Sequence, residues 1–258
     1  MLRAHFFLEW LLRFFHLGLA LRVQRQIRRT IQKKNGTQAS VFVHMCTYNG
    51  VATIEQAVKS MISQSHTDWY LFISDDASTD STWKLIQELS QEDARIEVTL
   101  MSQNLHSSGK AHRNIGLQKF FEGHWDYYTI LDQDDVAEKR WLQRCLNLNW
   151  EGLMAMRMWN ARYDVSLERK LYEYPAAAQL MVSRRGLEGM EYRRGTGVPV
   201  DTDFLFRLEF RAIKRFQAIV VAPFLCQKMR FSETNQTANL EPTTIGRWGF
   251  FWKYFWSA

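Results

Sequence analysis

Residues 41–74 read VFVHMCTYNGVATIEQAVKSMISQSHTDWYLFIS, a stretch in which two apolar runs flank a segment of helical periodicity. The runs at 41–45 and 69–74 are short and rich in β-branched and aromatic residues, as buried strands are. Between them, residues 53–64 place apolar side chains along one side of a helix, namely Ile54, Ala57, Val58, Met61 and Ile62. The stretch therefore predicts a strand–helix–strand unit.

The same alternation continues downstream, where further strands are predicted at 96–100 and 127–131 with helices between them. This rhythm is typical of a parallel sheet with right-handed crossovers. We expect an α/β fold with a Rossmann-like, mostly parallel central sheet and helices on both faces. Because no low-complexity linker interrupts residues 41–240, the sequence predicts one domain, with bounds at 38–240.

Polar loops follow three of the predicted strands: TYNG at 47–50, DDASTD at 75–80 and LDQDD at 131–135. The carboxyl ends of parallel strands meet at one edge of a sheet, where open α/β sheets bind their ligands. We therefore expect the loops to converge. The last of them crowds Asp132, Asp134 and Asp135 together, although like charges repel and burial disfavours each of them.

The positive charge of the chain is concentrated near its start. Residues 1–36 contain eight Lys or Arg and one acidic residue and carry +7, which leaves −1 for the other 222 residues of a chain with net charge +6. A basic pI of this origin does not favour a nucleic-acid partner. The three cysteines are far apart and form no disulfide or zinc pattern, as expected of a cytosolic protein.

Residues 1–37 predict an amphipathic basic helix, and residues 241–258 an aromatic tail that contains FFWKYFW. The N-terminal segment is interrupted by too many charges to span a bilayer. It suits a membrane surface, where its Arg and Lys face anionic lipid, and the tail suits the headgroup zone. The alternative is that both segments pack on the domain itself or, for the helix, on a second subunit.

Four segments resemble family 2 glycosyltransferases of the GT-A fold and occur in the order that the family shows. They are TYNG with SMISQSHTDWYLFISDDASTDST, then NLHSSGKAHRNIGL, LDQDD and VDTDFLFRL at 200–208. The resemblance covers residues 41–237. LDQDD and VDTDFLFRL together are also similar to the bacterial rhamnosyltransferase branch. The resemblance implies a UDP-, dTDP- or GDP-sugar as donor.

The resemblance also implies a role for the crowded carboxylates. A divalent cation, Mg²⁺ or Mn²⁺, would bridge them to the donor diphosphate and relieve their repulsion. By the family pattern Asp134 is the metal ligand, and Asp132 contacts the ribose or a metal-bound water. Asp135 has no assigned role. A surface cluster of turn and capping residues is the alternative.

The nucleotide would lie against the first two loops. The resemblance implies that an acid of the second loop, Asp76 or its neighbour Asp75, accepts a hydrogen bond from the base. Thr47, Tyr48 and Asn49 would line the base pocket, and Arg113 and Asn114 would lie near the diphosphate or ribose. Helix capping by Asp75, Ser78 or Asp80, and solvation of the helix surface by Arg113 and Asn114, are the alternatives.

Asp201 is the expected catalytic base, with Asp203 as the second candidate and helix capping as the alternative for both. The family usually has Glu-Asp where this chain has Val200-Asp201, a departure that affects positioning of the acceptor. A second departure follows Arg230, where Phe231 and Ser232 stand in place of a His. Arg230 is therefore expected to assist the phosphates.

Together these features predict an inverting, metal-dependent glycosyltransferase that acts on a lipid-linked glycan or lipopolysaccharide acceptor. We expect it to be cytoplasmic and peripheral on the inner face of the cytoplasmic membrane. One alternative is a non-catalytic relative that binds sugar nucleotides or glycans. Another is a membrane scaffold whose body is inert, although three acidic loops at one sheet edge argue against it.

Overall fold

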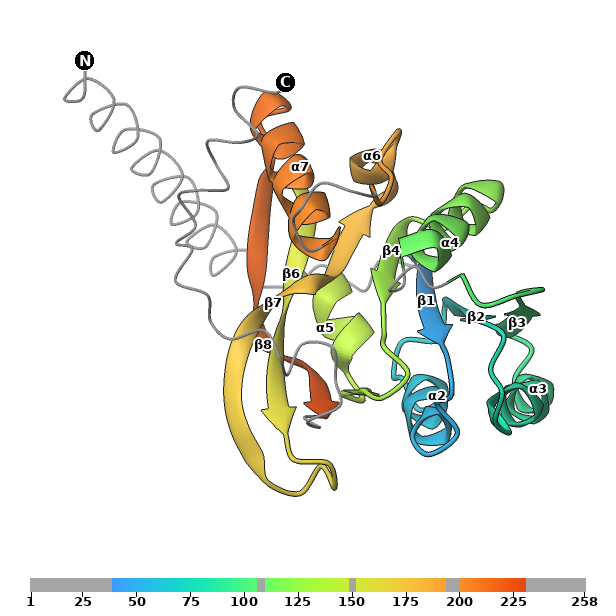
Figure 1. Ribbon diagram of the computed structural model, residues 1–258. Helices are drawn as coiled ribbons and strands as arrows, with labels where there is room; N and C mark the ends of the chain where they lie inside the picture. The colour runs from blue at the N-terminus through green and yellow to red at the C-terminus, as the bar shows by residue number, and fades with distance from the viewer. Residues whose placement is uncertain (1–38, 106–109, 149–151, 194–199, 231–258) are drawn as a thin grey trace, which may run out of the picture.

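The computed structural model describes residues 39–105, 110–148, 152–193 and 200–230. They form a mixed α/β domain around one sheet (Figure 1). The predicted N-terminal helix (1–37) and aromatic tail (241–258) lie outside the described residues. Among the helices of the described ranges, none combines the length and the hydropathy needed to cross a bilayer.

The first half of the domain alternates strands and helices, as predicted. Its elements are β1 (Val41–Thr47), α2 (Ile54–Ile62), β2 (Trp69–Asp75), α3 (Thr82–Glu92), β3 (Ile96–Leu100), α4 (Lys110–Glu122) and β4 (Tyr127–Ile130). Strand β1 pairs in parallel with β2 and β4, and β2 pairs in parallel with β3. All four predicted strands and the parallel arrangement are confirmed.

The second half adds strands that the sequence analysis does not predict. Its elements are β5 (Val136–Ala137), α5 (Trp141–Leu146), β6 (Leu153–Tyr163), β7 (Lys170–Ser183), α6 (Arg184–Leu187), α7 (Val200–Lys214) and β8 (Ala218–Arg230). Strand β7 pairs antiparallel with β4 and β6, whereas β6 and β8 are parallel. The described sheet thus has the order β3-β2-β1-β4-β7-β6-β8-β5.

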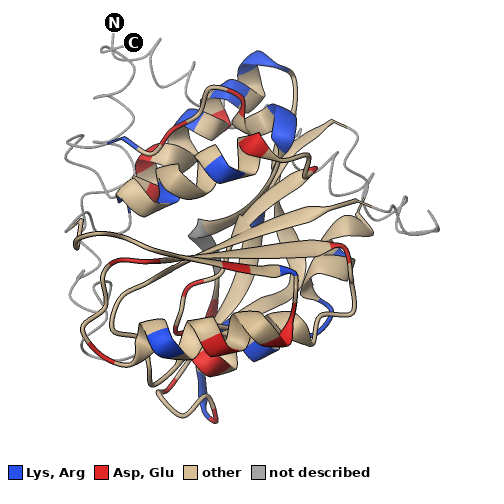
Figure 2. Ribbon diagram, turned by 90° about the vertical axis from the view of Figure 1, so that its right-hand side faces the viewer, with Lys and Arg blue, Asp and Glu red and all other residues tan. Residues whose placement is uncertain are grey.

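Strand β1 is buried on both faces of the sheet. Val41, Val43 and Met45 pack with α2 and α3 on one face, whereas Phe42 packs with α4 on the other. Helices cover both faces, as Figure 2 shows. Each large apolar side chain buried in this way stabilises the fold by about 1.5–3 kcal/mol, so the centre of the sheet is held firmly.

Helix α4 approaches β1 closely because Gly116 faces the ring of His44. A Cβ atom at this position would lie 2.1 Å from His44 Nδ1, far inside contact distance. The glycine of the segment NIGL therefore has a packing role. The close approach brings the first turns of α4, with His112 and Arg113, next to the carboxyl ends of the central strands.

Candidate functional site

The polar loops after β1, β2 and β4 are joined by hydrogen bonds. Gln133 accepts from the backbone N–H of Tyr48 at 3.0 Å and donates to its carbonyl at 3.2 Å. Asn49 Oδ1 accepts from the N–H of Thr79 at 2.8 Å, and Ser78 Oγ accepts from the N–H of Asn49 at 2.9 Å. The predicted convergence of the three loops is confirmed.

The side chains of the first loop differ in their availability to a ligand. Thr47 is buried and its hydroxyl donates to Gln133, so it fixes the loop from within. The Tyr48 ring is 44% exposed and can face a ligand. Asn49 has a left-handed backbone, with φ of 48°, and its amide oxygen is engaged by Thr79. Thr47 is thus unavailable to a ligand, whereas Tyr48 and Asn49 are both exposed.

The acid cluster lies at the carboxyl end of β4 and is partly desolvated. Burial raises the pKa of Asp134, and the neighbouring charge of Asp132 raises it further. Burial also raises the pKa of Asp135 well above its usual value, and both other carboxylates add to that shift. Asp132 accepts a hydrogen bond from Gln179 at 2.7 Å. The repulsion that the sequence implies is therefore present in the folded chain.

These carboxylates suit a hard cation that is completed by substrate oxygens. Among the described residues, no three His, Cys, Asp or Glu side chains are arranged as a ready-made metal site. Mg²⁺ is commonly held by one or two carboxylates together with substrate phosphates, so two acids are sufficient. Buried Asp135 Oδ2 has no hydrogen-bond partner among the described residues. Asp134 and Asp132 are the residues that would hold Mg²⁺ or Mn²⁺.

Two arginines from the second half of the chain lie beside the acids. The charges of Arg162 and Arg230 lower the pKa of Asp134 against the effect of burial. Arg230 donates to the Val165 carbonyl at 2.6 Å and contacts the Gln56 side chain. Arg162 donates to the Arg230 carbonyl at 3.2 Å. This is the side of the cluster where donor phosphates would meet positive charge.

The two acids of the second loop have different surroundings. Asp75 is fully buried, and its carboxylate accepts from the N–H and the hydroxyl of Ser78, both at 2.7 Å. It closes the turn before α3, as the capping alternative proposed. The Asp76 side chain is 13% exposed. Asp76 Oδ1 lies 2.8 Å from His112 Nε2 and accepts from the Leu105 N–H at 2.7 Å.

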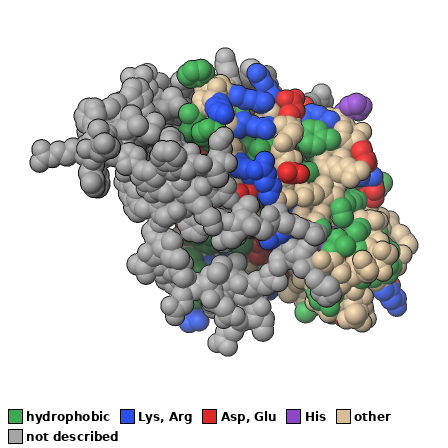
Figure 3. Space-filling view, turned by 45° about the horizontal axis from the view of Figure 1, so that its top comes forward, with side chains coloured by type: hydrophobic (Ala, Val, Ile, Leu, Met, Phe, Trp, Pro, Cys, Tyr) green, Lys and Arg blue, Asp and Glu red, His purple; other side chains and the backbone are tan. Residues whose placement is uncertain are grey.

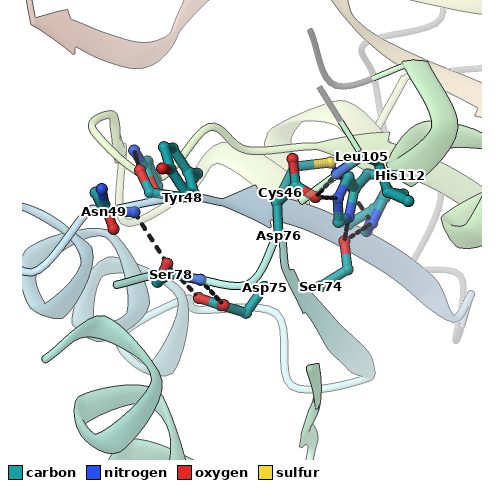
Figure 4. Close-up of polar contacts among 11 residues, drawn as sticks. Cys46, Tyr48, Asn49, Ser74, Asp75, Asp76, Ser78, Leu105 and His112 are labelled. Atoms are coloured by element: carbon teal, nitrogen blue, oxygen red, sulfur yellow. Dashed lines mark hydrogen bonds and ion pairs between the residues drawn. The ribbon is translucent and has the colours of Figure 1, made fainter. Parts of the chain in front are cut away.

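A row of buried polar side chains extends from Asp76 into the core (Figure 4). His112 Nδ1 lies 3.0 Å from Ser74 Oγ, which in turn lies 3.1 Å from His44 Nε2. His44 Nδ1 lies 3.1 Å from the Tyr128 hydroxyl. Burial, reinforced by His112 and Arg113, lowers the pKa of His44 to about 3. His44 is therefore neutral at physiological pH.

Arg113 and the predicted base Asp201 form an ion pair between α4 and the first turn of α7. The Arg113 side chain is 12% exposed and that of Asp201 29%. The contact falls on Asp201 Oδ1, and the structure shows no contact of a described residue with Oδ2. Arg113 also lies 5.5 Å above the Tyr192 ring. The candidate base thus lies next to a cation.

Asp203 is placed differently from Asp201. Its side chain is fully buried and pairs with Arg207, at 2.8 Å to Nε and 2.7 Å to Nη2. Arg207 also donates to the Glu191 carbonyl at 2.6 Å. An inward carboxylate fixed by a two-point ion pair is poorly placed to accept a proton from a substrate. The geometry therefore favours Asp201 over Asp203 as the base.

Asn114 binds the chain itself through both groups of its amide. Its nitrogen donates to the Tyr192 carbonyl at 2.8 Å, and its oxygen accepts from the Tyr192 N–H at 2.7 Å. The Tyr192 ring stacks on Phe204 with centroids 4.2 Å apart. Asn114 thereby connects α4 to α7 and stabilises the wall beside Arg113.

Several residues of this site have no role that is predicted from the sequence. His112 precedes Arg113 in the segment NLHSSGKAHRNIGL, and a polar His44 within an apolar strand is a signal of a buried hydrogen-bond partner. Arg162 and Gln179 belong to strands that are not predicted, and no local pattern identifies them. No sequence pattern identifies Tyr192 either, and its role is visible only in the folded structure.

The chain belongs to glycosyl transferase family 2, since residues 42–209 match that family's sequence profile. The dTDP-rhamnosyl transferase RfbG of Shigella flexneri is 38% identical over 96 residues, 37% of this chain and 33% of that protein. The Campylobacter jejuni GalNAc(5)-diNAcBac-PP-undecaprenol beta-1,3-glucosyltransferase is 34% identical over 89 residues, 34% and 28% respectively. The chain spans less than half the length of these curated relatives.

Solved structures show the same fold. A mannosyltransferase from Pyrobaculum calidifontis, solved in complex with GDP-Man and Mn²⁺, superposes with a TM-score of 0.58 at 14% sequence identity. The match covers 88% of this chain and 69% of that one. The GT-A fold that the sequence implied is therefore confirmed, as is the resemblance to family 2, with a rhamnosyltransferase among its relatives.

Proposed function

We propose that the chain is an inverting, metal-dependent glycosyltransferase that moves a sugar from a nucleoside diphosphate sugar to a membrane-linked glycan. The observation that carries this proposal is the meeting of the Asp76, Asp132 and Asp134 loops at one sheet edge, with Asp201 on α7 paired to Arg113. A nucleotide base, a diphosphate and an acceptor hydroxyl each find a suitable group there. Membership of family 2 supports the same activity.

The donor would be held by an acidic group and an aromatic ring at its base and by positively charged groups at its phosphates. Asp76 accepts a hydrogen bond from the base, Tyr48 covers the ring, and Arg113 and Arg230 face the phosphates. Mg²⁺ or Mn²⁺ held by Asp134 and Asp132 would supply positive charge to the departing diphosphate. A related fold solved with GDP-Man and Mn²⁺ supports this assignment.

Asp201 would act as the general base. An inverting transfer needs one carboxylate to take the proton of the acceptor hydroxyl while its oxygen attacks the anomeric carbon. Arg113 pairs with Oδ1, and Oδ2 would receive the proton. Because Arg113 also interacts electrostatically with Asp132, it would couple donor binding to the position of the base.

Donor binding is testable by metal-dependent thermal stabilisation. We expect one of UDP-, dTDP- and GDP-sugars to raise the melting temperature when Mn²⁺ or Mg²⁺ is present, and EDTA to reverse the rise. Saturation at a hundred times Kd stabilises a native state by about 2.7 kcal/mol. For a chain of this size that corresponds to roughly 5–10 °C. No shift with any of the three donors would contradict the proposal.

The acceptor is proposed to be a lipid-linked glycan or a lipopolysaccharide precursor for cell-surface polysaccharide. The name of one relative, from Campylobacter jejuni, specifies an undecaprenol-linked acceptor. The proposed organisation is a basic helix at 1–37, the catalytic domain at 38–240 and an aromatic tail at 241–258. Both ends would lie on the inner face of the cytoplasmic membrane, which places the enzyme in the cytoplasm as a peripheral protein.

Liposome flotation tests the membrane proposal. We expect the full chain to float with anionic vesicles and a chain truncated to begin at Gln38 to float much less. Each basic residue near an anionic surface contributes about 1 kcal/mol. The electrostatic share should fade in 1 M salt, where the Debye length is about 3 Å. Equal flotation of both chains would instead favour a helix packed on the protein.

The second candidate is a non-catalytic relative that binds sugar nucleotides or glycans. Val200 in place of the usual Glu, and the engagement of Asp201 by Arg113, are the observations that favour it. Release of free nucleoside diphosphate when acceptor is added distinguishes the two. An enzyme releases it in proportion to acceptor, whereas a binding protein releases none.

A further inference from the structure

We propose that His112 is a positioning residue that holds Asp76 as an acceptor for a ring N–H, so that the pocket takes uracil, thymine or guanine nucleotides and rejects cytosine and adenine nucleotides. The inference rests on the proposed nucleotide site and adds the selection of the base. It is carried by the buried row Asp76–His112–Ser74–His44–Tyr128. The first three of these residues are labelled in Figure 4.

The row is shielded from water. His44 and Ser74 are fully buried, His112 is 1% exposed and Tyr128 is 2% exposed. Buried polar groups are costly unless each donor finds an acceptor. The protons of the row must therefore be distributed so that each contact joins one hydrogen-bond donor to one acceptor.

One distribution with neutral imidazoles gives each neighbouring pair a donor and an acceptor, with the His112 Nε2–Asp76 contact close in distance but not aligned as a hydrogen bond. An ionised Asp76 only accepts, so His112 Nε2 must carry the proton between them, and its Nδ1 is then an acceptor. Ser74 donates to that nitrogen and accepts from His44 Nε2–H. His44 Nδ1 then accepts from the Tyr128 hydroxyl, which burial keeps protonated by raising its pKa well above the usual value. All the hydrogen bonds point toward the carboxylate.

One oxygen of the Asp76 carboxylate thus has two close nitrogen neighbours, the Leu105 N–H in a hydrogen bond and His112 Nε2 in a 2.8 Å ion-pair contact that is not aligned as a hydrogen bond. His112 Nε2 and the Leu105 N–H both contact Oδ1, and no described residue contacts Oδ2. Oδ2 therefore offers lone pairs to a ligand. The ring N–H of uracil, thymine or guanine complements it, whereas the bare ring nitrogen of cytosine or adenine would repel it. Selection arises because the wrong base leaves a partly buried charge without a partner.

A matched pair of variants separates positioning from packing. His112→Gln keeps an amide N–H long enough to reach Asp76, whereas His112→Asn is shorter by one methylene and does not reach it. Both retain a polar side chain in the row. Asp76→Ala removes the acceptor itself, and the melting temperature of each variant reports its folding.

Isothermal titration with Mn²⁺ present would measure UDP against CDP, GDP against ADP, and pyrophosphate, which has no base. We expect the wild type to prefer UDP to CDP, or GDP to ADP, by about tenfold or more, as a hydrogen bond to a charged group supplies. His112→Asn should lose most of that preference, and His112→Gln should keep it. Pyrophosphate affinity should be equal in all.

Other outcomes overturn the inference in distinct ways. If His112→Asn retains the preference while Asp76→Ala loses it, Asp76 recognises the base without help from His112. If His112→Asn weakens pyrophosphate as much as UDP, His112 serves only the packing of the site. If Asp76→Ala leaves the preference intact, the proposed base pocket itself is wrong.

Discussion

Replacing Asp134 with Ala is expected to abolish both sugar transfer and the metal dependence of nucleotide binding. Asp134 is the carboxylate that we propose shares a cation with the donor diphosphate. Metal stabilisation of the departing charge is worth several kcal/mol, so we expect transfer to fall by about 10²–10⁴-fold or more. Titration of the variant with nucleotide and Mn²⁺ measures the binding part directly. Unchanged affinity and unchanged metal dependence would refute the assignment.

Asp134→Asn should lose activity, but its metal-free form should be at least as stable as the wild type. Asp132 and the buried Asp135 repel Asp134, so neutralising it relieves strain that the fold otherwise bears. We expect the metal-free melting temperature to stay level or rise by about 1–4 °C, since 1 kcal/mol shifts a domain of this size by about 2–4 °C. Glu92→Gln, a charge removed from the exposed end of α3, is the matched control and should change neither activity nor metal binding.

Asp201→Asn is expected to slow transfer by about 10²–10⁴-fold, the contribution of a positioned general base, while donor binding is retained. Asparagine is nearly isosteric with aspartate and can still accept from Arg113, so the α4–α7 contact is preserved. Transfer is measured with saturating donor, and donor affinity by titration. A loss of donor affinity equal to the loss of transfer would show that Asp201 supports the donor site instead of the chemistry.

Asp203→Asn provides the comparison for Asp201→Asn. Asp203 is buried against Arg207, so its replacement should lower the melting temperature. The protein that remains folded should keep most of its activity. Breaking a buried ion pair costs about 3–5 kcal/mol when one charge is left behind, and less when a hydrogen bond survives. An active Asp201→Asn beside an inactive but folded Asp203→Asn would reverse the assignment of the base.

The first half of the fold is predictable because its signals are local. Strands β1 to β4 are short apolar runs, and the intervening helices carry their own periodicity, so each element is visible within a dozen residues. The second half is not. Strand β6 reads LMAMRMWNARY, rich in good helix formers, and becomes a strand because β7 and β8 pair with its two edges. Tertiary pairing overrides the local preference there.

The candidate site divides in the same way. Asp76, Asp132 and Asp134 are found from the sequence because acids after apolar strands are conspicuous. Their partners are not, since Gln179 lies 47 residues from Asp132 and meets it only through the antiparallel β4–β7 pairing. The ion pair of Arg113 with Asp201 spans α4 and α7, and no spacing rule predicts it.

The sheet order has an evolutionary consequence. The groups assigned to the nucleotide base and the metal lie on consecutive loops of β1, β2 and β4, whereas Asp201 and Arg230 belong to a later stretch joined through β7. The groups proposed for the nucleotide base and the metal thus precede β7 in the sequence, whereas the proposed base Asp201 and the phosphate-facing Arg230 follow it. Recombination or drift in the later segment can change the acceptor and leave the nucleotide pocket intact.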